Sequence, residues 1–152
     1  MLPSFESVVA DHGPAVLRFC AAQVGPDRAE DCFQEAMLAA LRGYDQLRDP
    51  AAIRPWLFSI AARKAIDAHR ARGRAPDPTD EVDEVALGDG PPEPEDGLWA
   101  EVRALPTKQS QAVTLRYRAD LTHAEVAEVM EISEAAARRN VFEGLRRLRR
   151  NR

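Results

Sequence analysis

Apolar residues recur every three or four positions most regularly near the C-terminus, and this pattern predicts two short helices there. Thr122 and Glu125 have the spacing of a capping box, in which each side chain accepts a hydrogen bond from the other residue's backbone N–H. Ala124, Ala127 and Met130 follow at helical spacing and are expected to form the apolar face of the first helix.

The second helix is predicted to begin after Ser133, whose hydroxyl can accept a free backbone N–H as an N-cap. Its expected buried stripe recurs every three or four residues and consists of Ala137, Val141, Leu145 and Leu148. The remaining face is polar and mostly basic, and it carries Arg138, Arg139, Asn140, Arg146, Arg147, Arg149 and Arg150. Two short helices with this polarity indicate a helix-turn-helix whose recognition helix spans 134–147. The alternative is a helical hairpin whose arginines only keep it in solution.

The first half of the chain has helical periodicity and no strand alternation. One helix is expected over 4–24, with a kink or break at Gly13-Pro14 and an end at Gly25-Pro26. Its core candidates are the apolar residues Phe5, Val8, Val9, Val16, Leu17 and Phe19.

Asp27 and Glu30 have the spacing of another capping box, which predicts a second helix. The apolar positions of that helix are Ala29, Phe33, Ala36, Met37, Ala40 and Leu41. After a loop from Gly43 to Pro55, the run that begins at Trp56 predicts a third helix. On pattern alone Trp56 is a core residue, and a role in nucleic-acid binding requires that a base can stack on it at the surface.

Composition and charge divide the chain into two helical modules, 1–72 and 98–152, around an acidic segment. Residues 73–98 contain five of the eleven prolines and four of the eight glycines, with one basic and nine acidic groups. Residues 73–97 are therefore expected to be a flexible linker. The net charge of −4 does not argue against a nucleic-acid partner, because residues 99–152 hold eleven basic and seven acidic groups. In the second module, helices are predicted from Leu98 to Pro106 and, with Thr107 as its cap, along the following residues.

Several classes of protein are disfavoured. No apolar run is long enough to span a membrane, so a cytoplasmic protein is expected. Cys20 and Cys32 fit no disulfide framework and are expected to be reduced core thiols, while a metal site with His12 is a minor alternative. We find no nucleophile elbow, P-loop or paired metal-ligand motif, so neither an enzyme nor a cofactor or small-molecule substrate is expected.

Two long segments together resemble one known family. The segment AEDCFQEAMLAALRGYDQLRDPAAIRPWLFSIAARKAIDAHRAR resembles region 2 of the extracytoplasmic-function (ECF) sigma factors of bacterial RNA polymerase. The segment ALPTKQSQAVTLRYRADLTHAEVAEVMEISEAAARRNVFEGLRRLRR resembles region 4 of the same family. The resemblance covers most of residues 4–150 and implies an all-α protein of two small domains, with core polymerase, promoter DNA and an anti-sigma factor as partners.

The resemblance also implies a role for each surface. Residues implied to bind the polymerase are Asp31, Gln34 and Glu35. Residues implied to melt and recognise the minus-ten element are Asp49, Arg54, Trp56, Arg63, Lys64, Asp67 and Arg70. Residues implied to bind the minus-thirty-five element are Thr122, Ser133, Glu134, Arg138, Arg139, Asn140, Glu143, Arg146 and Arg147.

Four positions depart from the family pattern. Lys64 stands where Asn is usual, and Asn140 and Glu143 stand where Arg is typical. Glu131 stands where the turn usually has Gly, which costs free energy if that position requires a positive φ. Two other functions therefore stay open: a helix-turn-helix regulator that acts without polymerase, and a divergent member that acts chiefly through protein–protein contacts.

Overall fold

The computed structural model describes residues 1–71 and 97–151, and the described residues are helical, with no strand among them. The elements are α1 (Phe5–Val24), α2 (Ala29–Gly43), the 3-10 turns η1 (Tyr44–Gln46) and η2 (Pro50–Ala52), α3 (Ile53–Ala71), α5 (Leu98–Arg103), α6 (Thr107–Tyr117), α7 (His123–Met130) and α8 (Glu134–Arg150). The predicted acidic linker lies outside the described residues, apart from Gly97.

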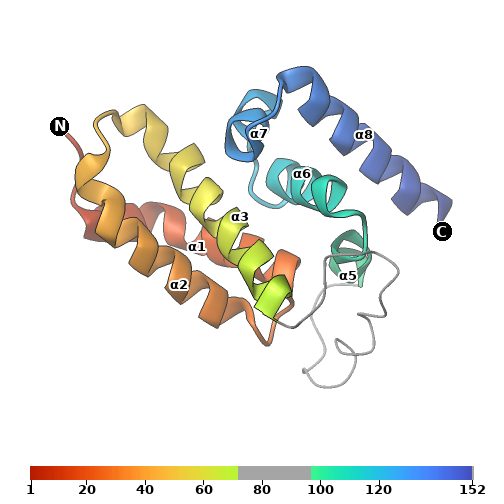
Figure 1. Cartoon of the computed structure of the whole chain (residues 1–152), viewed down its shortest axis with the longest axis horizontal. Helices are drawn as coiled ribbons and strands as arrows, with labels where there is room; N and C mark the ends of the chain where they lie inside the picture. Colours follow the sequence, from red (N-terminus) through yellow and green to blue (C-terminus); the bar gives the residue numbers. More distant parts are fainter. Residues whose placement is uncertain (72–96, 152) are drawn as a thin grey trace.

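The first bundle consists of α1, α2 and α3, which pack on one another around a fully buried aromatic pair (Figure 1). The rings of Phe19 and Phe58 meet edge to face with centroids 5.8 Å apart. Cys20 and Cys32 lie buried in this core as free thiols. Interaction with the Cys32 side chain, together with burial, raises the pKa of the Cys20 thiol.

The boundaries of the first bundle correct three sequence predictions. First, α1 continues through Pro14 as one helix, which excludes the break but not the kink that was predicted there as the other possibility. Second, the capping box of Asp27 with Glu30 does not form, and Arg28 precedes the helix without a side-chain cap. Carbonyls of the Gly25-Pro26 turn instead accept the N–H groups of Arg28 and Ala29, and the helix begins at Ala29.

The third correction is that α3 begins at Ile53 rather than at Trp56. The Asp49 carboxylate accepts the Ala51 N–H at 3.0 Å, and the η2 turn runs directly into α3. Pro55 then falls in the first turn of the helix, where backbone N–H groups have no intrahelical acceptor and proline is tolerated.

The second bundle consists of α5 to α8, with α6 packed closely across α8. Gly144 lies at this crossing, where an added Cβ would be 2.7 Å from Val113 Cγ2. Gly144 is buried beside Ala137, Val141 and Leu148, whereas Leu145, which we expected in that stripe, is half-buried.

Two local predictions in the second bundle are wrong. Pro106 precedes α6, so Thr107 is its first residue and not its cap. In α7 the buried residues are Val126, Ala127 and Val129, while Ala124 is exposed. α7 packs against both α8 and α3. The valine side chain is larger than that of alanine, so burial of Val126 and Val129 removes more apolar surface from water than burial of Ala124 would.

The turn between α7 and α8 is closed by a Schellman motif centred on Glu131. The Ile132 N–H donates to Ala127 O at 3.1 Å, and the Glu131 N–H donates to Glu128 O at 3.3 Å. Glu131 has φ 60° and ψ 47°, which is the left-handed region. The positive φ that made Glu131 a costly departure is therefore present.

The two bundles pack against each other, α1 against α5 and α6, and α3 against α7 (Figure 1). One hydrophobic core continues across the junction and contains Phe58 and Ala61 from the first bundle with Leu115, Leu121 and Val126 from the second. The predicted fold class, an all-α protein of two helical domains, is confirmed. Their close packing was not predicted.

Replacing Glu131 by glycine should stabilise the protein. The left-handed conformation costs a residue with a Cβ about 1–2 kcal/mol, and glycine's greater flexibility offsets about 0.5–1 kcal/mol of that gain. We expect Glu131→Gly to raise the free energy of unfolding by about 0.5–1 kcal/mol in urea titrations. Glu128→Gly, the same change inside α7, should lower it by about 1 kcal/mol. Equal losses in both variants would contradict the strain at Glu131.

Candidate nucleic-acid interface

Side-chain caps fix both helices of the helix-turn-helix at their N-terminal ends. The Thr122 hydroxyl accepts the Glu125 N–H at 3.1 Å, and Glu125 Oε1 accepts the Thr122 N–H at 2.9 Å. The Ser133 hydroxyl accepts the Ala136 N–H at 3.0 Å. The capping box and the N-cap predicted from the sequence are confirmed, and they set where α8 begins relative to α7.

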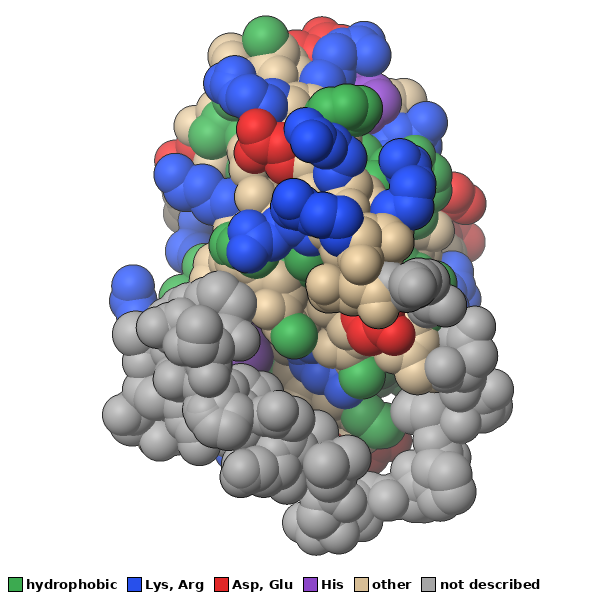
Figure 2. Space-filling model, turned by 90° about the vertical axis from the view of Figure 1, so that its right-hand side faces the viewer, with side chains coloured by type: hydrophobic (Ala, Val, Ile, Leu, Met, Phe, Trp, Pro, Cys, Tyr) green, Lys and Arg blue, Asp and Glu red, His purple; other side chains and the backbone are tan. Residues whose placement is uncertain are grey.

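The outer face of α8 is strongly basic. Its exposed cationic side chains are Arg138, Arg139, Arg146, Arg147, Arg149 and Arg150. Figure 2, which views the side of the molecule where α8 lies, shows arginine and lysine side chains gathered over this surface. A dense row of guanidinium groups on one helix is the electrostatic footprint expected of a surface that binds nucleic-acid phosphates.

Three polar residues of α8 modify that basic face in different ways. Glu134 forms an ion pair with Arg138 at 2.9 Å, and since both side chains are about half exposed, it is weak and exchangeable. Asn140 donates its amide to Ala136 O at 3.1 Å and is half-buried, so it lies at the flank of the helix. Glu143 is exposed on the same side as the arginines.

The beginning of α7 is also surrounded by cations. Arg116 Nη1 donates to Leu121 O at 3.3 Å, directly before the capping box. Burial, Arg138 and Arg116 lower the pKa of His123, the first residue of α7. Arg116 and Arg138 therefore combine their positive fields at the N-terminus of α7, where the helix dipole is itself positive, and these fields favour the neutral form of His123. The sequence analysis did not select Arg116 or His123, because neither lies on the recognition helix.

Phe142 is a second residue that sequence reasoning missed. Its side chain is 59% exposed, and the guanidinium of Arg146 lies 6.0 Å from its ring centre. Phe142 is four residues after Arg138 and four before Arg146, so its position on the arginine side of the helix could have been found from the spacing alone. It places an apolar group among donors on the face of a recognition helix.

The predicted minus-ten residues divide into two groups. Arg63, Asp67 and Arg70 are exposed along one side of α3, with Lys64 half-buried beside them. Trp56 is half-buried in the core, where it packs against Tyr44 with ring centres 6.3 Å apart. The core interpretation of Trp56 agrees with this packing.

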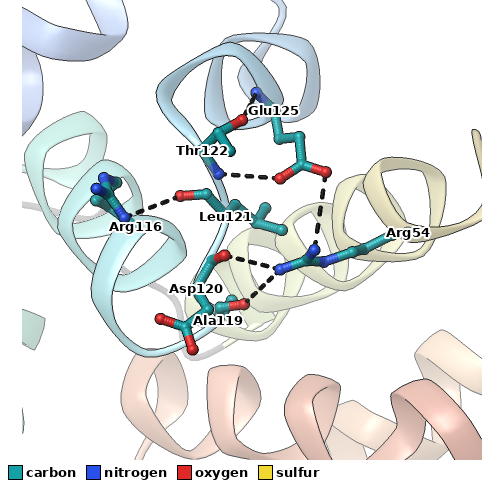
Figure 3. A network of polar contacts seen from close by, with 7 residues as sticks. All are labelled: Arg54, Arg116, Ala119, Asp120, Leu121, Thr122 and Glu125. Atoms are coloured by element: carbon teal, nitrogen blue, oxygen red, sulfur yellow. Dashed lines mark hydrogen bonds and ion pairs between the residues drawn. The ribbon is translucent and has the colours of Figure 1, made fainter.

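Arg54 lies apart from that surface and contacts the second bundle instead (Figure 3). Its Nη2 donates to Ala119 O at 3.2 Å and to Asp120 O at 2.8 Å, and its Nη1 lies 3.9 Å from Glu125 Oε2. Asp120 has φ 63°, a left-handed conformation that aspartate tolerates better than most residues. The turn between α6 and α7 therefore presents two carbonyl oxygens to one guanidinium.

The exposed face of α2 combines carboxylates with apolar side chains. Asp31, Gln34 and Glu35 are exposed, as predicted for a partner surface. Leu38 is 53% exposed and Leu41 is 54% exposed on the same helix. We expected Leu41 in the core, which is wrong, since Cys32, Ala36 and Ala40 fill that side. An amphipathic surface with unburied leucines is typical of a helix that docks on another protein.

Two other kinds of site are not found within residues 1–71 and 97–151. These ranges contain no group of three His, Cys, Asp or Glu side chains able to hold a metal ion. None of their helices has both the length and the apolar character needed to cross a membrane.

Comparisons with known proteins assign both bundles to one family. The family model for sigma-70 region 2 matches residues 8–75, and that for sigma-70 region 4 matches residues 96–148. The chain is 32% identical to the ECF RNA polymerase sigma factor SigD of Mycobacterium tuberculosis (strain ATCC 25618 / H37Rv), over 90% of this chain and 71% of SigD. The chain belongs to the ECF RNA polymerase sigma factors. It is thus a transcription initiation factor that binds core RNA polymerase and directs transcription from specific promoters.

Other relatives agree with this assignment. The ECF RNA polymerase sigma-E factor of Escherichia coli (strain K12) is 30% identical over 74% of this chain and 67% of its own length. The sigma factor RpoE, solved with the anti-sigma factor NepR from Bartonella quintana, has the same fold, with a TM-score of 0.78 at 19% identity over 96% of this chain and 94% of RpoE. CnrH, solved with the cytosolic domain of CnrY, gives a TM-score of 0.70 at 23% identity over 95% of this chain and 84% of CnrH.

Proposed function

We propose that this sigma factor divides promoter recognition among three surfaces: α2 for core RNA polymerase, α3 for the minus-ten element and α8 for the minus-thirty-five element. The observation that carries this proposal is the exposed arginine face of α8, on a capped helix-turn-helix, in a chain of this family. The protein would act in the cytoplasm, where promoter DNA and polymerase are found.

The polymerase surface is proposed to be Asp31, Gln34 and Glu35 with Leu38 and Leu41. Burial of two exposed leucines supplies a hydrophobic contribution. The carboxylates at the beginning of α2 would add electrostatic complementarity to a basic partner surface, which increases specificity and the rate of association.

The minus-ten surface is proposed to comprise Arg63, Lys64, Asp67 and Arg70 on α3, together with Asp49, Arg54 and Trp56 from its beginning. Exposed cations along one helix can follow the phosphates of a separated strand, since such contacts do not depend on base sequence. Lys64, where the family usually has Asn, would contact phosphate rather than a base edge.

The minus-thirty-five surface is proposed to be α8 lying in the major groove. Arg138 and Arg139, near its N-terminus, would reach base edges, while Arg146 and Arg147 contact phosphates. Phe142 lies between them and would contact a thymine methyl group, the apolar feature that the major groove offers. Glu143 would accept from a cytosine amino group. Thr122, Ser133, Glu134 and Asn140 would position α8 through the caps, the ion pair and the amide contact described above.

An anti-sigma factor is proposed as a further partner. Two proteins with the same fold were solved with a bound partner. RpoE is in complex with the anti-sigma factor NepR, and CnrH is in complex with the cytosolic domain of CnrY. The exposed leucines of α2 would provide an apolar surface for an inhibitor that competes with polymerase.

Single substitutions should separate polymerase binding from promoter binding. We expect Asp31→Ala to weaken association with core polymerase, and Arg138→Ala to weaken promoter binding by about five- to 100-fold while core affinity is unchanged. Run-off transcription on fragmented genomic DNA, with core affinity measured in parallel, checks both. Gln46→Ala, an exposed change outside all three surfaces, is the control. Unchanged promoter affinity of Arg138→Ala at physiological salt would show that α8 does not dock as proposed.

Phe142→Ala should relax base preference without destabilising the fold. Because the ring is largely exposed, the free energy of unfolding should change by less than about 0.5 kcal/mol. Promoter selection from a randomised minus-thirty-five element should lose preference at one thymine, by about fivefold or more. Phe142→Leu, which keeps an apolar side chain, should retain part of that preference. Identical selected sequences for wild type and Phe142→Ala would exclude the methyl contact.

A further inference from the structure

We propose that Cys20 and Cys32 form a redox site, which a hydroperoxide converts from two thiols into a disulfide bond that joins α1 to α2. The site lies outside the three surfaces proposed for polymerase and promoter, and its chemistry does not depend on how those surfaces divide their roles. Both cysteines are free in the structure, which therefore shows the reduced form.

The first observation is that the two cysteines lie at the same level of a helical hairpin. α1 ends at Val24 and α2 begins at Ala29, and the two helices pack closely on each other (Figure 1). Cys20 is four residues before the end of α1, and Cys32 is three residues after the beginning of α2. At about 1.5 Å per residue, the two positions differ by only about 1.5 Å in their distance from the turn.

The second observation is that both side chains are turned into the same interface. Cys20 is 0% exposed and Cys32 is 5% exposed, and they belong to one hydrophobic core. Each side chain also changes the pKa of the other thiol, so the two groups interact. A disulfide requires Cβ atoms about 3.5–4.5 Å apart. Buried positions at one level of two closely packed helices can reach that separation with a small adjustment.

The surroundings make Cys32 the more reactive thiol. Interaction with Cys20 lowers the pKa of Cys32, and the positive charge of Lys64 lowers it further, whereas burial and the carboxylates of Glu35 and Asp67 oppose this shift. The pKa of Cys20 is raised. Cys32 is also slightly exposed, so a water-sized oxidant reaches it more easily than it reaches Cys20. Because the thiolate is the nucleophile, Cys32 attacks first.

The reaction balances with hydrogen peroxide as the oxidant. The Cys32 thiolate attacks one peroxide oxygen, and the O–O bond breaks to give a sulfenic acid and a hydroxide ion. The hydroxide takes up the proton that the Cys32 thiol had released. The Cys20 sulfur then attacks the Cys32 sulfur, and the S–O bond breaks as water leaves with the Cys20 proton. The two sulfur atoms lose two electrons, and peroxide is reduced to two molecules of water.

The bond would stabilise the helix that carries the proposed polymerase surface. Closing the ring of residues 20–32 restricts the unfolded chain, which favours the folded state. Asp31, Gln34 and Glu35 remain exposed on α2, while Cys32 is buried, so the bond leaves the proposed surface uncovered. This last step rests on the proposed function of α2. It assigns to the redox site a stabilising role in oxidising conditions, with polymerase binding retained.

The test treats the full-length protein with hydrogen peroxide under native conditions and measures its mass after the remaining thiols are alkylated. We expect the wild type to lose two hydrogen atoms, about 2 Da, and a thiol reductant to restore them. Trypsin cleaves after Arg18, Arg28 and Arg42, so the bond should join peptide 19–28 to peptide 29–42. The oxidised protein should melt about 5 °C or more above the reduced protein. Its affinity for core polymerase should be unchanged.

Alanine substitutions separate the roles of the two thiols. In Cys20→Ala, Cys32 should still form a sulfenic acid, which dimedone labels, but no bond to another residue of the chain. In Cys32→Ala, the remaining Cys20 should be oxidised about tenfold more slowly, since its thiolate is disfavoured. Alanine keeps both positions apolar, and melting without oxidant shows whether each variant is folded. If either variant does not fold, the mass and peptide results of the wild type still decide.

The inference would be overturned if the wild type kept both thiols, if its cysteines bonded only to other molecules, or if the disulfide form melted no higher than the reduced form. Loss of polymerase binding in the disulfide form would overturn the stabilising role. A failure of the proposed polymerase surface gives a different result, because the bond would still form and raise the melting temperature while Asp31→Ala left core affinity unchanged.

Discussion

The packing of α7 against both α8 and α3 is the interaction on which the rest of the structure depends. Val126 and Leu121 are fully buried there, within a core that also includes Phe58 of the first bundle. By covering one side of α7, α8 completes the helix-turn-helix and turns its arginines toward solvent. By covering another side, α3 brings Arg54 to the turn before α7.

Because α3 and α8 both pack on α7, the contacts that stabilise the fold also determine which proposed binding surfaces are exposed. The surfaces proposed for polymerase and for the minus-thirty-five element remain exposed in the packed state, so each could make a first contact with its partner. The beginning of α3 is different, because Arg54 is engaged by backbone carbonyls. Arg54, one of the residues proposed for the minus-ten element, is thus held by the turn before α7 in this arrangement.

The sequence predicted the architecture well wherever local chemistry decided the structure. The capping box of Thr122 and Glu125, the N-cap at Ser133, the end of α1 at Gly25 and the cost at Glu131 each depend on a few neighbouring residues. Prediction failed where backbone groups or distant segments replaced a side chain. At the beginning of α2, backbone carbonyls of the preceding turn accept the first N–H groups, and the predicted box at Asp27 does not form. In α7, Val126 and Val129 are buried in place of Ala124.

The placement of Arg54 and Gln23 could not be predicted for the same reason. The nearest hydrogen-bond acceptor of Arg54 is 65 positions away in the sequence, and it is a backbone carbonyl, which no residue type reveals. The side chains that accept from Gln23 are 87 and 91 positions away. Phe142, in contrast, could have been recognised from its position between two arginines, and it was missed because the search followed polar residues.

The most direct test of this account is the distance between the two bundles, measured by energy transfer between dyes on Gln46→Cys and Ala100→Cys, in the free protein and on a promoter with core polymerase. Both positions are exposed, whereas Cys20 and Cys32 are buried. The account predicts high transfer in the free protein, where the bundles pack on each other, and its loss on the promoter complex, where α3 and α8 are proposed to bind two separate elements. Equal transfer in the two states would contradict it.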